Sequence, residues 1–389
     1  MKKLFMLSGL LVIILGVAFA LAACSQVAFG GSMEEKKTDI INDFDDINIC
    51  VNTADINFVL TSDDSCKVVA YDRKRIRYDV FAENGTLNVK TVDERRWFER
   101  IFSFGGASLT VYLPNTEYSS LTIGASTGDI TVPKDFRLGS LDIELSTGDT
   151  QIFASVGDSV KVKGSTGDVT VENISCCSLE VKISTGATVV RGVNASGDID
   201  FECSTGHTEL ADVVCENFSS VGDTGNISVI NLTASGNTSI ERSTGDVVID
   251  KINASGDLSV ETDTGKITVS DAVCIDLEAD VTTGKCNLSG INCRSFNSEG
   301  DTGDIEMTSL IATGKISIDR STGDVSFDRC DAIELEVKTD TGSVKGTLLS
   351  EKVFIAKSSN GRIEVPETIG GGKCKITTST GNIKIEITE

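Results

Sequence analysis

Aspartate residues recur at a nearly constant spacing and are the first candidates for chemistry in this sequence. Asp129, Asp149 and Asp168 each follow a Thr-Gly pair, at intervals of 20 and 19 residues. If the intervening units stack as neighbouring strands, the three carboxylates recur roughly every 4.8 Å along one edge and repel one another. Calcium would relieve this repulsion with oxygen ligands, so the three residues are candidate calcium ligands.

Other members of the same row argue against a continuous cation site. Lys266, Lys285 and Arg362 occupy the position after the glycine in other units. The sequence also lacks the nine-residue glycine and aspartate repeat of calcium-binding β-rolls. A solvated turn edge is therefore the alternative interpretation, and calcium is the only metal or cofactor considered.

The rest of the sequence offers little for catalysis. His207 is the only histidine, so any histidine-based triad or metal site would depend on it. No motif brings together an acid, a base and a metal, so no catalytic residue is predicted, and a polysaccharide-active β-helix enzyme is kept as a minor alternative. The net charge of −23 opposes binding to nucleic acid.

The 12 cysteines have two possible roles. Cys274 and Cys293 fall in adjacent units, where a Cα separation near one strand spacing would permit a disulfide. Cys50 and Cys66 flank the first irregular strands and are the second candidate pair. Alternatively, many cysteines are small buried hydrophobic residues, because nine units carry Ala or Cys at the same position, nine residues after the glycine. These nine are Cys176, Ala195, Cys215, Ala234, Ala254, Cys274, Cys293, Ala312 and Ala332.

A repeat in the sequence predicts the structural elements that position these residues. Fourteen glycines are separated by 19 or 20 residues, and threonine precedes all but one of them. The residue four positions later is apolar in all units but one, and each unit holds about three short stretches of alternating apolar and polar residues, as β-strands do. The marked glycines are Gly128, Gly148, Gly167, Gly186, Gly206, Gly225, Gly245, Gly265, Gly284, Gly303, Gly323, Gly342, Gly361 and Gly381.

A single unit is too small to bury its own apolar side chains, whereas stacked units enclose a continuous core. The sequence therefore predicts an all-β protein with a parallel β-solenoid, or β-helix, over residues 121–389. It would contain about 14 regular coils, one for each marked glycine. Right-handed winding is the default for parallel crossovers.

Residues 33–120 lack the Thr-Gly mark but keep strand alternation. They are predicted to form irregular capping coils that keep the first strand edges from aggregating. Thr53-Ala54-Asp55 resembles a decayed corner of the repeat.

A basic and aromatic cluster lies inside this capping region. Arg95 and Arg96 precede Trp97 and Phe98. One interpretation is a short helix that closes the end of the core. The other is a patch that rests on an anionic membrane.

Residues 1–32 are predicted to be a membrane anchor or a lipoprotein signal with a short linker. Leu4–Ala23 is almost uninterruptedly apolar and as a helix would span roughly 30 Å, the thickness of a hydrocarbon core. Lys2 and Lys3 favour an amino end in the cytoplasm. Cys24 follows Leu-Ala-Ala, which resembles a bacterial lipobox, and is a lipidation candidate. An uncleaved anchor, a lipoprotein and a cleaved secreted product remain open, and the first two place the protein on the extracytoplasmic face of the membrane.

The order of these segments resembles a known bacterial family. The apolar amino terminus and irregular strands are followed by Ser108–Pro114, by Leu121–Ile123 and by the first corner, Ser126–Asp129. Over about residues 40–389 this order is similar to that of the domain-of-unknown-function family of β-solenoid envelope proteins known as “putative adhesins”. The resemblance implies a surface β-solenoid with no catalytic residues to carry over, and some relatives are associated with envelope-stress systems.

These features predict a non-enzymatic, envelope-anchored surface protein. As an adhesin or polymer-binding protein it would hold a cell-wall or host-surface polymer through many weak contacts along the shaft. The alternative is an envelope-stress sensor or regulatory element that acts through its membrane-proximal cap. The expected partners are the membrane, through the amino-terminal segment, and such a polymer, but not nucleic acid.

Overall fold

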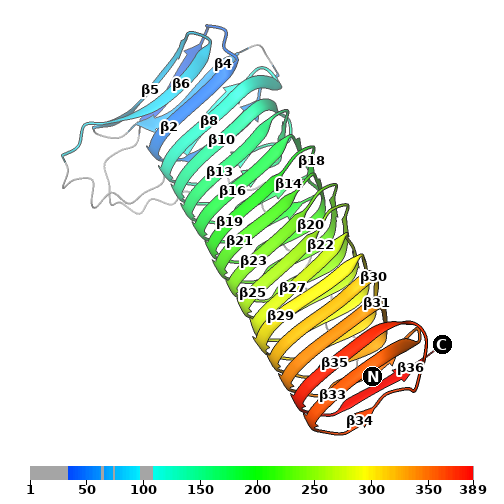
Figure 1. Ribbon diagram of the computed structural model, residues 1–389. Coiled ribbons are helices and arrows are strands. Elements are labelled where there is room, and N and C mark those ends of the chain that lie inside the picture. Colours follow the sequence, from blue (N-terminus) through cyan, green and yellow to red (C-terminus); the bar gives the residue numbers. More distant parts are fainter. Residues whose placement is uncertain (1–33, 63–64, 73–74, 97–107, 389) are drawn as a thin grey trace, which may run out of the picture.

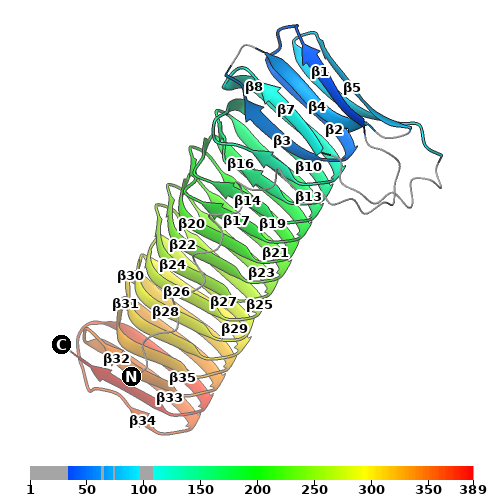
Figure 2. The same ribbon diagram turned by 180° about the vertical axis from the view of Figure 1, so that it is seen from behind.

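The computed structural model of the protein describes residues 34–62, 65–72, 75–96 and 108–388. Every regular element in these ranges is a β-strand, and the strands stack into one long shaft (Figure 1 and Figure 2). Strands from successive coils pair in parallel along the shaft. The predicted all-β parallel solenoid is therefore confirmed.

Each coil contributes a strand to two faces of the shaft. Face 1 holds the strand that enters the Thr-Gly corner, and face 2 holds the strand that leaves it. Face 1 comprises β8 (Glu117–Thr127), β10 (Arg137–Thr147), β13 (Ser159–Thr166), β16 (Ser178–Thr185), β19 (Ile199–Thr205), β21 (Phe218–Thr224), β23 (Thr238–Thr244), β25 (Leu258–Thr264), β27 (Asp276–Thr283) and β29 (Ser295–Thr302). Face 2 comprises β9 (Ile130–Val132), β11 (Thr150–Ile152), β14 (Val169–Glu172), β17 (Thr188–Arg191), β20 (Thr208–Cys215), β22 (Ile227–Ala234), β24 (Val247–Ala254), β26 (Ile267–Val273) and β28 (Cys286–Cys293).

Five further strands lie outside this simple alternation. Short strands lie between face 2 and the next face 1 strand in the early coils, and two long strands run through both faces of later coils. The short strands are β12 (Ser155–Val156), β15 (Ser175–Cys176) and β18 (Asn194–Ala195), and the long ones are β30 (Ile305–Thr322) and β31 (Val325–Thr341).

Backbone contacts at the Thr-Gly corners set the stacking. The N–H of Gly148 donates to the carbonyl oxygen of Thr166 over 2.9 Å, and Gly167 donates to Thr185 over 3.0 Å. A Cβ on Gly167 would lie 1.9 Å from the carbonyl oxygen of Gly148, and the φ of Gly167 is 139°. Both the close approach and the backbone angle exclude an L side chain, which explains why glycine marks every coil.

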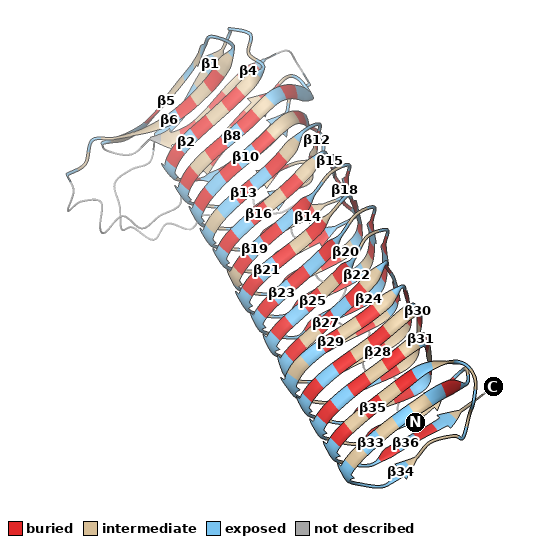
Figure 3. Cartoon of the chain, viewed as in Figure 1, coloured by how far each residue is buried: buried red, intermediate tan, exposed pale blue. Residues whose placement is uncertain are grey.

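The core fills the space between the faces. Along most strands, buried side chains alternate with exposed or partly exposed ones (Figure 3). The apolar residue four positions after the corner glycine is buried in every coil from Val132 to Phe327. All nine Ala and Cys residues at the position nine residues after the glycine are also buried, and Ala312 lies opposite both Cys293 and Ala332. The interpretation of these residues as small buried ones is confirmed.

A second corner, six residues after the glycine, depends on left-handed backbone. Asn173, Asp212 and Lys251 have φ values of 56°, 56° and 64°. Gly192 and Gly290 adopt the same conformation at this position in other coils. Because this corner accepts several residue types, it leaves no constant mark in the sequence.

Two arginines project into the core. Arg242 and Arg320 are 3% and 1% exposed. Each lies opposite a glycine of the preceding coil, Gly222 or Gly300, which leaves room for the guanidinium group. Arg242 donates hydrogen bonds to the carbonyl oxygen and the Oγ of Ser220 over 3.1 and 2.8 Å. These bonds replace the hydration that a buried charge loses.

The amino-terminal cap is built from β1 (Glu34–Ile40), β2 (Asp46–Thr53), β3 (Asp55–Leu60), β4 (Cys66–Asp72), β5 (Ile76–Glu83), β6 (Thr86–Asp93) and β7 (Ser108–Leu113). β2 and β3 form the coil next to the first marked corner, where the N–H of Ala54 donates to Thr127 over 2.9 Å, so the decayed corner is confirmed. β6 and β7 stack outside β2 and β3 in parallel. β5 then pairs antiparallel with β6, and β4 with β7 and β1.

At the carboxyl end, the spatial order of the coils departs from the chain order. This end contains β32 (Val344–Leu348), β33 (Lys352–Asn360), β34 (Ile363–Glu364), β35 (Gly372–Thr380) and β36 (Ile383–Ile387). β35 lies between β31 and β33, and β36 lies between β32 and β34. The outermost coil, β33 with β34, therefore comes earlier in the chain than the last coil, β35 with β36, which lies beneath it.

Replacing Gly186 with alanine tests the corner constraint. The φ of Gly186 is 146°, and a Cβ would lie 2.0 Å from the carbonyl oxygen of Gly167. We expect Gly186→Ala to lower the free energy of unfolding by about 2–4 kcal/mol in urea denaturation. Gly124→Ala is the control, because no described atom lies within 4 Å of its Cβ, and it should change stability by less than about 0.5 kcal/mol. Equal losses in the two variants would contradict the constraint.

Candidate functional site

The predicted aspartate row lies at the corners of consecutive coils. The N–H of Asp149 donates to Oδ1 of Asp129 over 2.9 Å, and the N–H of Asp168 donates to Oδ1 of Asp149 over 2.8 Å. The N–H of Ala187 continues the ladder to Asp168 over 2.7 Å. Each carboxylate thus caps the turn of the next coil.

The same three aspartates are the candidate calcium ligands. In the described ranges, no three His, Cys, Asp or Glu side chains are grouped so as to hold a metal ion. Calcium binding by the row stays a prediction. His207 lies exposed at a corner, and its carbonyl oxygen accepts the N–H of Thr188 over 2.9 Å, as any corner residue does.

A hollow opens on face 1 beside the corners of β10, β13, β16 and β19. It forms at Gly164, which lies three residues before its corner, where the neighbouring coils carry Leu145 and Ile183. The hollow has a solvent-open volume of about 270 Å³. The hollow therefore spans four consecutive coils.

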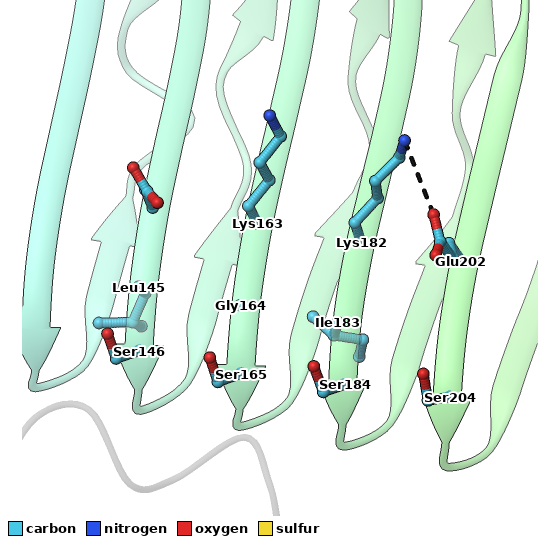
Figure 4. Close-up of a pocket in the computed structure, with 11 residues that line it drawn as sticks. Leu145, Ser146, Lys163, Gly164, Ser165, Lys182, Ile183, Ser184, Glu202 and Ser204 are labelled. Atoms are coloured by element: carbon cyan, nitrogen blue, oxygen red, sulfur yellow. Dashed lines mark ion pairs between the residues drawn. The ribbon is translucent and has the colours of Figure 1, made fainter.

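A row of four serines follows the hollow. Ser146, Ser165, Ser184 and Ser204 each precede a corner threonine and lie one per coil (Figure 4). None of the four hydroxyls makes a hydrogen bond with another residue in the described part of the chain. All four are therefore available to a ligand.

A second row carries charge. Glu144, Lys163, Lys182 and Glu202 lie opposite one another across the four coils. Lys182 pairs with Glu180 at 3.0 Å and with Glu202 at 3.7 Å, and its hydrogen bond to Glu180 raises the pKa of Lys182. Lys163 makes no ion pair with any described residue. Lys163 thus brings to an acidic protein a positive charge that has no direct ion pair among the described residues.

The two rows are suited to binding an extended polymer. Hydroxyl, ammonium and carboxylate groups that repeat about every 4.8 Å can hydrogen-bond an extended chain rich in hydroxyl or anionic groups. A serine nucleophile needs a base within hydrogen-bond reach, and in the ranges described no base contacts these four hydroxyls.

Further along face 1 the surface becomes strongly acidic. One carboxylate per coil projects from five consecutive coils: Glu241, Glu261, Asp280, Glu299 and Asp319. Oδ1 of Asp280 accepts the N–H of Glu299 over 2.7 Å. Burial, together with the neighbouring carboxylates, raises the pKa of Asp280 to about 6. The shaft thus carries a lysine-containing hollow and an acidic stripe at different heights.

The structure brings together one of the two predicted cysteine pairs. Cys274 and Cys293 are buried free thiols in adjacent coils, and burial raises the pKa of each to about 12. Such thiols are almost wholly protonated at neutral pH and react slowly. Cys50 is exposed on β2 while Cys66 is buried on β4, and these two strands do not pair within the described residues. The second pair is therefore not brought together.

The predicted membrane-facing cluster is described only in part. Arg95 donates to Asp93 from Nε over 2.8 Å and from a terminal nitrogen over 2.7 Å, so its charge is matched locally. Arg96 follows directly, whereas Trp97 and Phe98 lie outside the described residues. Both interpretations of this cluster remain predictions.

The predicted amino-terminal anchor also lies outside the described residues. Leu4–Ala23 and the lipidation candidate Cys24 belong to residues 1–33. In the part of the chain that is described, no helix is long and apolar enough to span a membrane. The choice between an anchor, a lipoprotein signal and a cleaved leader stays a prediction.

Sequence reasoning missed the hollow, although two signals for it were present. Serine precedes the corner threonine in five consecutive units, from Ser126 to Ser204. Gly164 interrupts a position that is apolar in both flanking units. A search for departures from the repeat consensus would have found Gly164.

Comparisons with known proteins agree with the architecture. A family model described as Toastrack DUF4097 matches residues 44–270 and 256–389. No curated protein matches the sequence.

Several solved structures are also similar to this chain. A “putative adhesin” of Bacteroides fragilis is 14% identical over 92% of this chain and 100% of its own, with a TM-score of 0.24. A “putative adhesin” of Parabacteroides distasonis is 11% identical over 90% and 97%, with a TM-score of 0.27. A “putative lipid binding protein” of the same species is 12% identical over 92% and 99%, with a TM-score of 0.23.

The pKa of Asp280 predicts a pH dependence of stability. The unfolded carboxyl ionises near pH 3.8 and the folded one near pH 6, so the folded state binds the proton more tightly between these values. This group's contribution to stability is therefore present below pH 3.8 and is lost as pH rises through 6. Asp280→Asn should stabilise the protein at pH 7 by about 1 kcal/mol, after discounting for solvent screening, with little effect at pH 4. Urea denaturation of both proteins across this range checks it, and a pH-independent difference would contradict it.

Proposed function

The chain belongs to the Toastrack DUF4097 family, and on this premise we propose that it is a non-enzymatic, envelope-anchored surface protein that binds an extended polymer along its shaft. The polymer is a cell-wall or host-surface chain rich in hydroxyl groups. Binding of this kind is the basis of an adhesive role. It requires no catalytic group and no cofactor.

The four free serine hydroxyls are the observation that carries this proposal. They repeat once per coil beside Lys163, in a hollow open to solvent. An extended polymer that lies across the coils meets the same donor and acceptor group at each step. Each contact is weak, but contacts made by one linked chain add through effective concentration.

The amino-terminal segment supports the proposed location. Twenty nearly uninterrupted apolar residues precede the solenoid in the sequence, whether they serve as an anchor or as a lipoprotein signal ending at Cys24. Either device would hold the shaft at the outer side of the membrane, where surface polymers are found. Calcium, if it binds the row of Asp129, Asp149 and Asp168, would add to this binding.

Co-sedimentation with purified bacterial cell wall tests the proposal. Residues 34–389 contain the buried core that the described residues form and are suitable for the assay. We expect saturable binding that weakens in Lys163→Glu and in the double variant Ser165→Ala with Ser184→Ala. Loss of two hydrogen bonds should weaken binding roughly tenfold or more. The assay is run with and without calcium to test the aspartate row.

Matched variants outside the hollow control for charge and for hydroxyl loss. Lys134→Glu makes the same charge change at an exposed residue of the shaft, and Ser243→Ala removes the equivalent hydroxyl from a coil beyond the hollow. Both should bind as the unaltered protein does. Equal weakening by the controls, or no binding to cell wall with or without calcium, would refute polymer binding at the hollow and favour a sensor role for the cap.

A further inference from the structure

The amino and carboxyl ends of the shaft differ in whether their outermost parallel coil is covered by further strands. At the amino end, the outermost parallel coil, β6 with β7, is covered by antiparallel strands, and its core residues Leu87 and Leu109 are fully buried. The outer strand β1 begins with the exposed charges of Glu34 to Lys37. Exposed charges on an edge strand oppose pairing with another strand. This end of the core is closed.

The carboxyl end is open. β33 pairs only with β35 and β34 only with β36 among the described strands, so the outer edge of each is unpaired. Ile363 is 40% exposed, whereas its neighbour in the coil beneath, Ile383, is fully buried. Phe354 and Ala356 also point toward the core but are only partly buried.

The side chains of β33 do not protect this edge. From Val353 to Asn360 its only charged side chain is Lys357, which points away from the core. Val353 and Ile355 are exposed on the same outward side. The single charge at the start of the strand is neutralised, because Nζ of the buried Lys352 lies 2.6 Å from Oδ1 of Asp331. The end thus combines free backbone donors and acceptors with uncovered apolar side chains.

We propose that a second copy of this chain covers the open end, so that two shafts join tip to tip. The cross-section of the tip is that of this protein's own coils, so another tip matches the separation of its two faces and the position of its core. A two-fold axis between the tips makes β33 pair antiparallel with β33 of the second copy and continues the core across the joint. The outer strands of the amino end, β1 and β5, both carry charged side chains that oppose pairing, so the assembly stops at a pair.

A definite register follows from the two-fold axis. With the axis at Ile355, this residue lies opposite its own symmetry mate. Phe354 then lies opposite Ala356 of the second copy, a large side chain against a small one on the core side. Val353 lies opposite Lys357 on the outward side. This register brings no two like charges of β33 together.

The pair has a consequence for adhesion. β1 lies at the far end of the shaft from β33 (Figure 1 and Figure 2). Two chains joined at their tips therefore hold their β1 strands at opposite ends. If the amino-terminal segments are anchored as proposed, the pair links two facing membranes. The tip contact itself is independent of the anchor and of the polymer.

Sedimentation analysis of residues 34–389 tests the contact without membrane or polymer. The exposed cysteines are first replaced, as Cys50→Ser and Cys177→Ser, so that they cannot cross-link. We expect the mass to rise from one chain to two with concentration, and Ile355→Lys to remain at one chain. Val248→Lys is the matched control, because Val248 is 41% exposed on the shaft and Ile355 is 43% exposed at the tip. It should pair as the parent does.

A cross-link locates the contact. Ile355→Cys should form a disulfide-linked pair under mild oxidation, and Val248→Cys should not. A mass of one chain at roughly 0.1 mM would overturn the proposal and indicate a different occupant of the tip. A pair that survives Ile355→Lys, or assemblies larger than two chains, would also overturn it. Circular dichroism and urea midpoints show whether each variant remains folded.

Discussion

The backbone contact between corner glycines is the constraint on which the rest of the structure depends. The carbonyl oxygen of one corner occupies the space that a Cβ of the next would need, as at Gly148 and Gly167. This contact holds successive coils in one register. Every other column, from the buried small residues to the outward serines, follows that register. A residue type repeated in the sequence therefore becomes a straight row in space.

Much of the architecture could be predicted because this constraint leaves a periodic mark. The glycine spacing predicted the coils. The alternation of apolar and polar residues around each glycine predicted which residues are buried. The order of coils at the carboxyl end could not be predicted in this way. Every corner presents the same backbone groups, so Gly342 can stack on Gly381 as well as on the next corner in the chain, Gly361. Spacing along the chain holds no information on which of these contacts forms.

The candidate site was harder to predict because it combines a regular serine row with a departure from the repeat at Gly164. Gly164 is one of 37 glycines, and only the stacking of the coils places it between Leu145 and Ile183 in the lining of the hollow. At Gly222 and Gly300, by contrast, the guanidinium groups of Arg242 and Arg320 occupy the space beside the glycine. The surroundings of such a glycine therefore depend on side chains of the adjacent coil, about 20 residues away in the sequence. The aspartate row shows the converse, in that its regular spacing arises from capping of the next turn.

The inserted last coil has a mechanical consequence for the tip. A chain terminus at the tip would fray first, because terminal residues lose few contacts when they detach. Here the terminal strand β36 lies one coil inside the shaft, bonded on both sides by β32 and β34. The outermost coil is instead an internal segment, held by continuous chain at both of its ends. This arrangement keeps an uncovered apolar edge ordered, which a surface that must meet a partner requires.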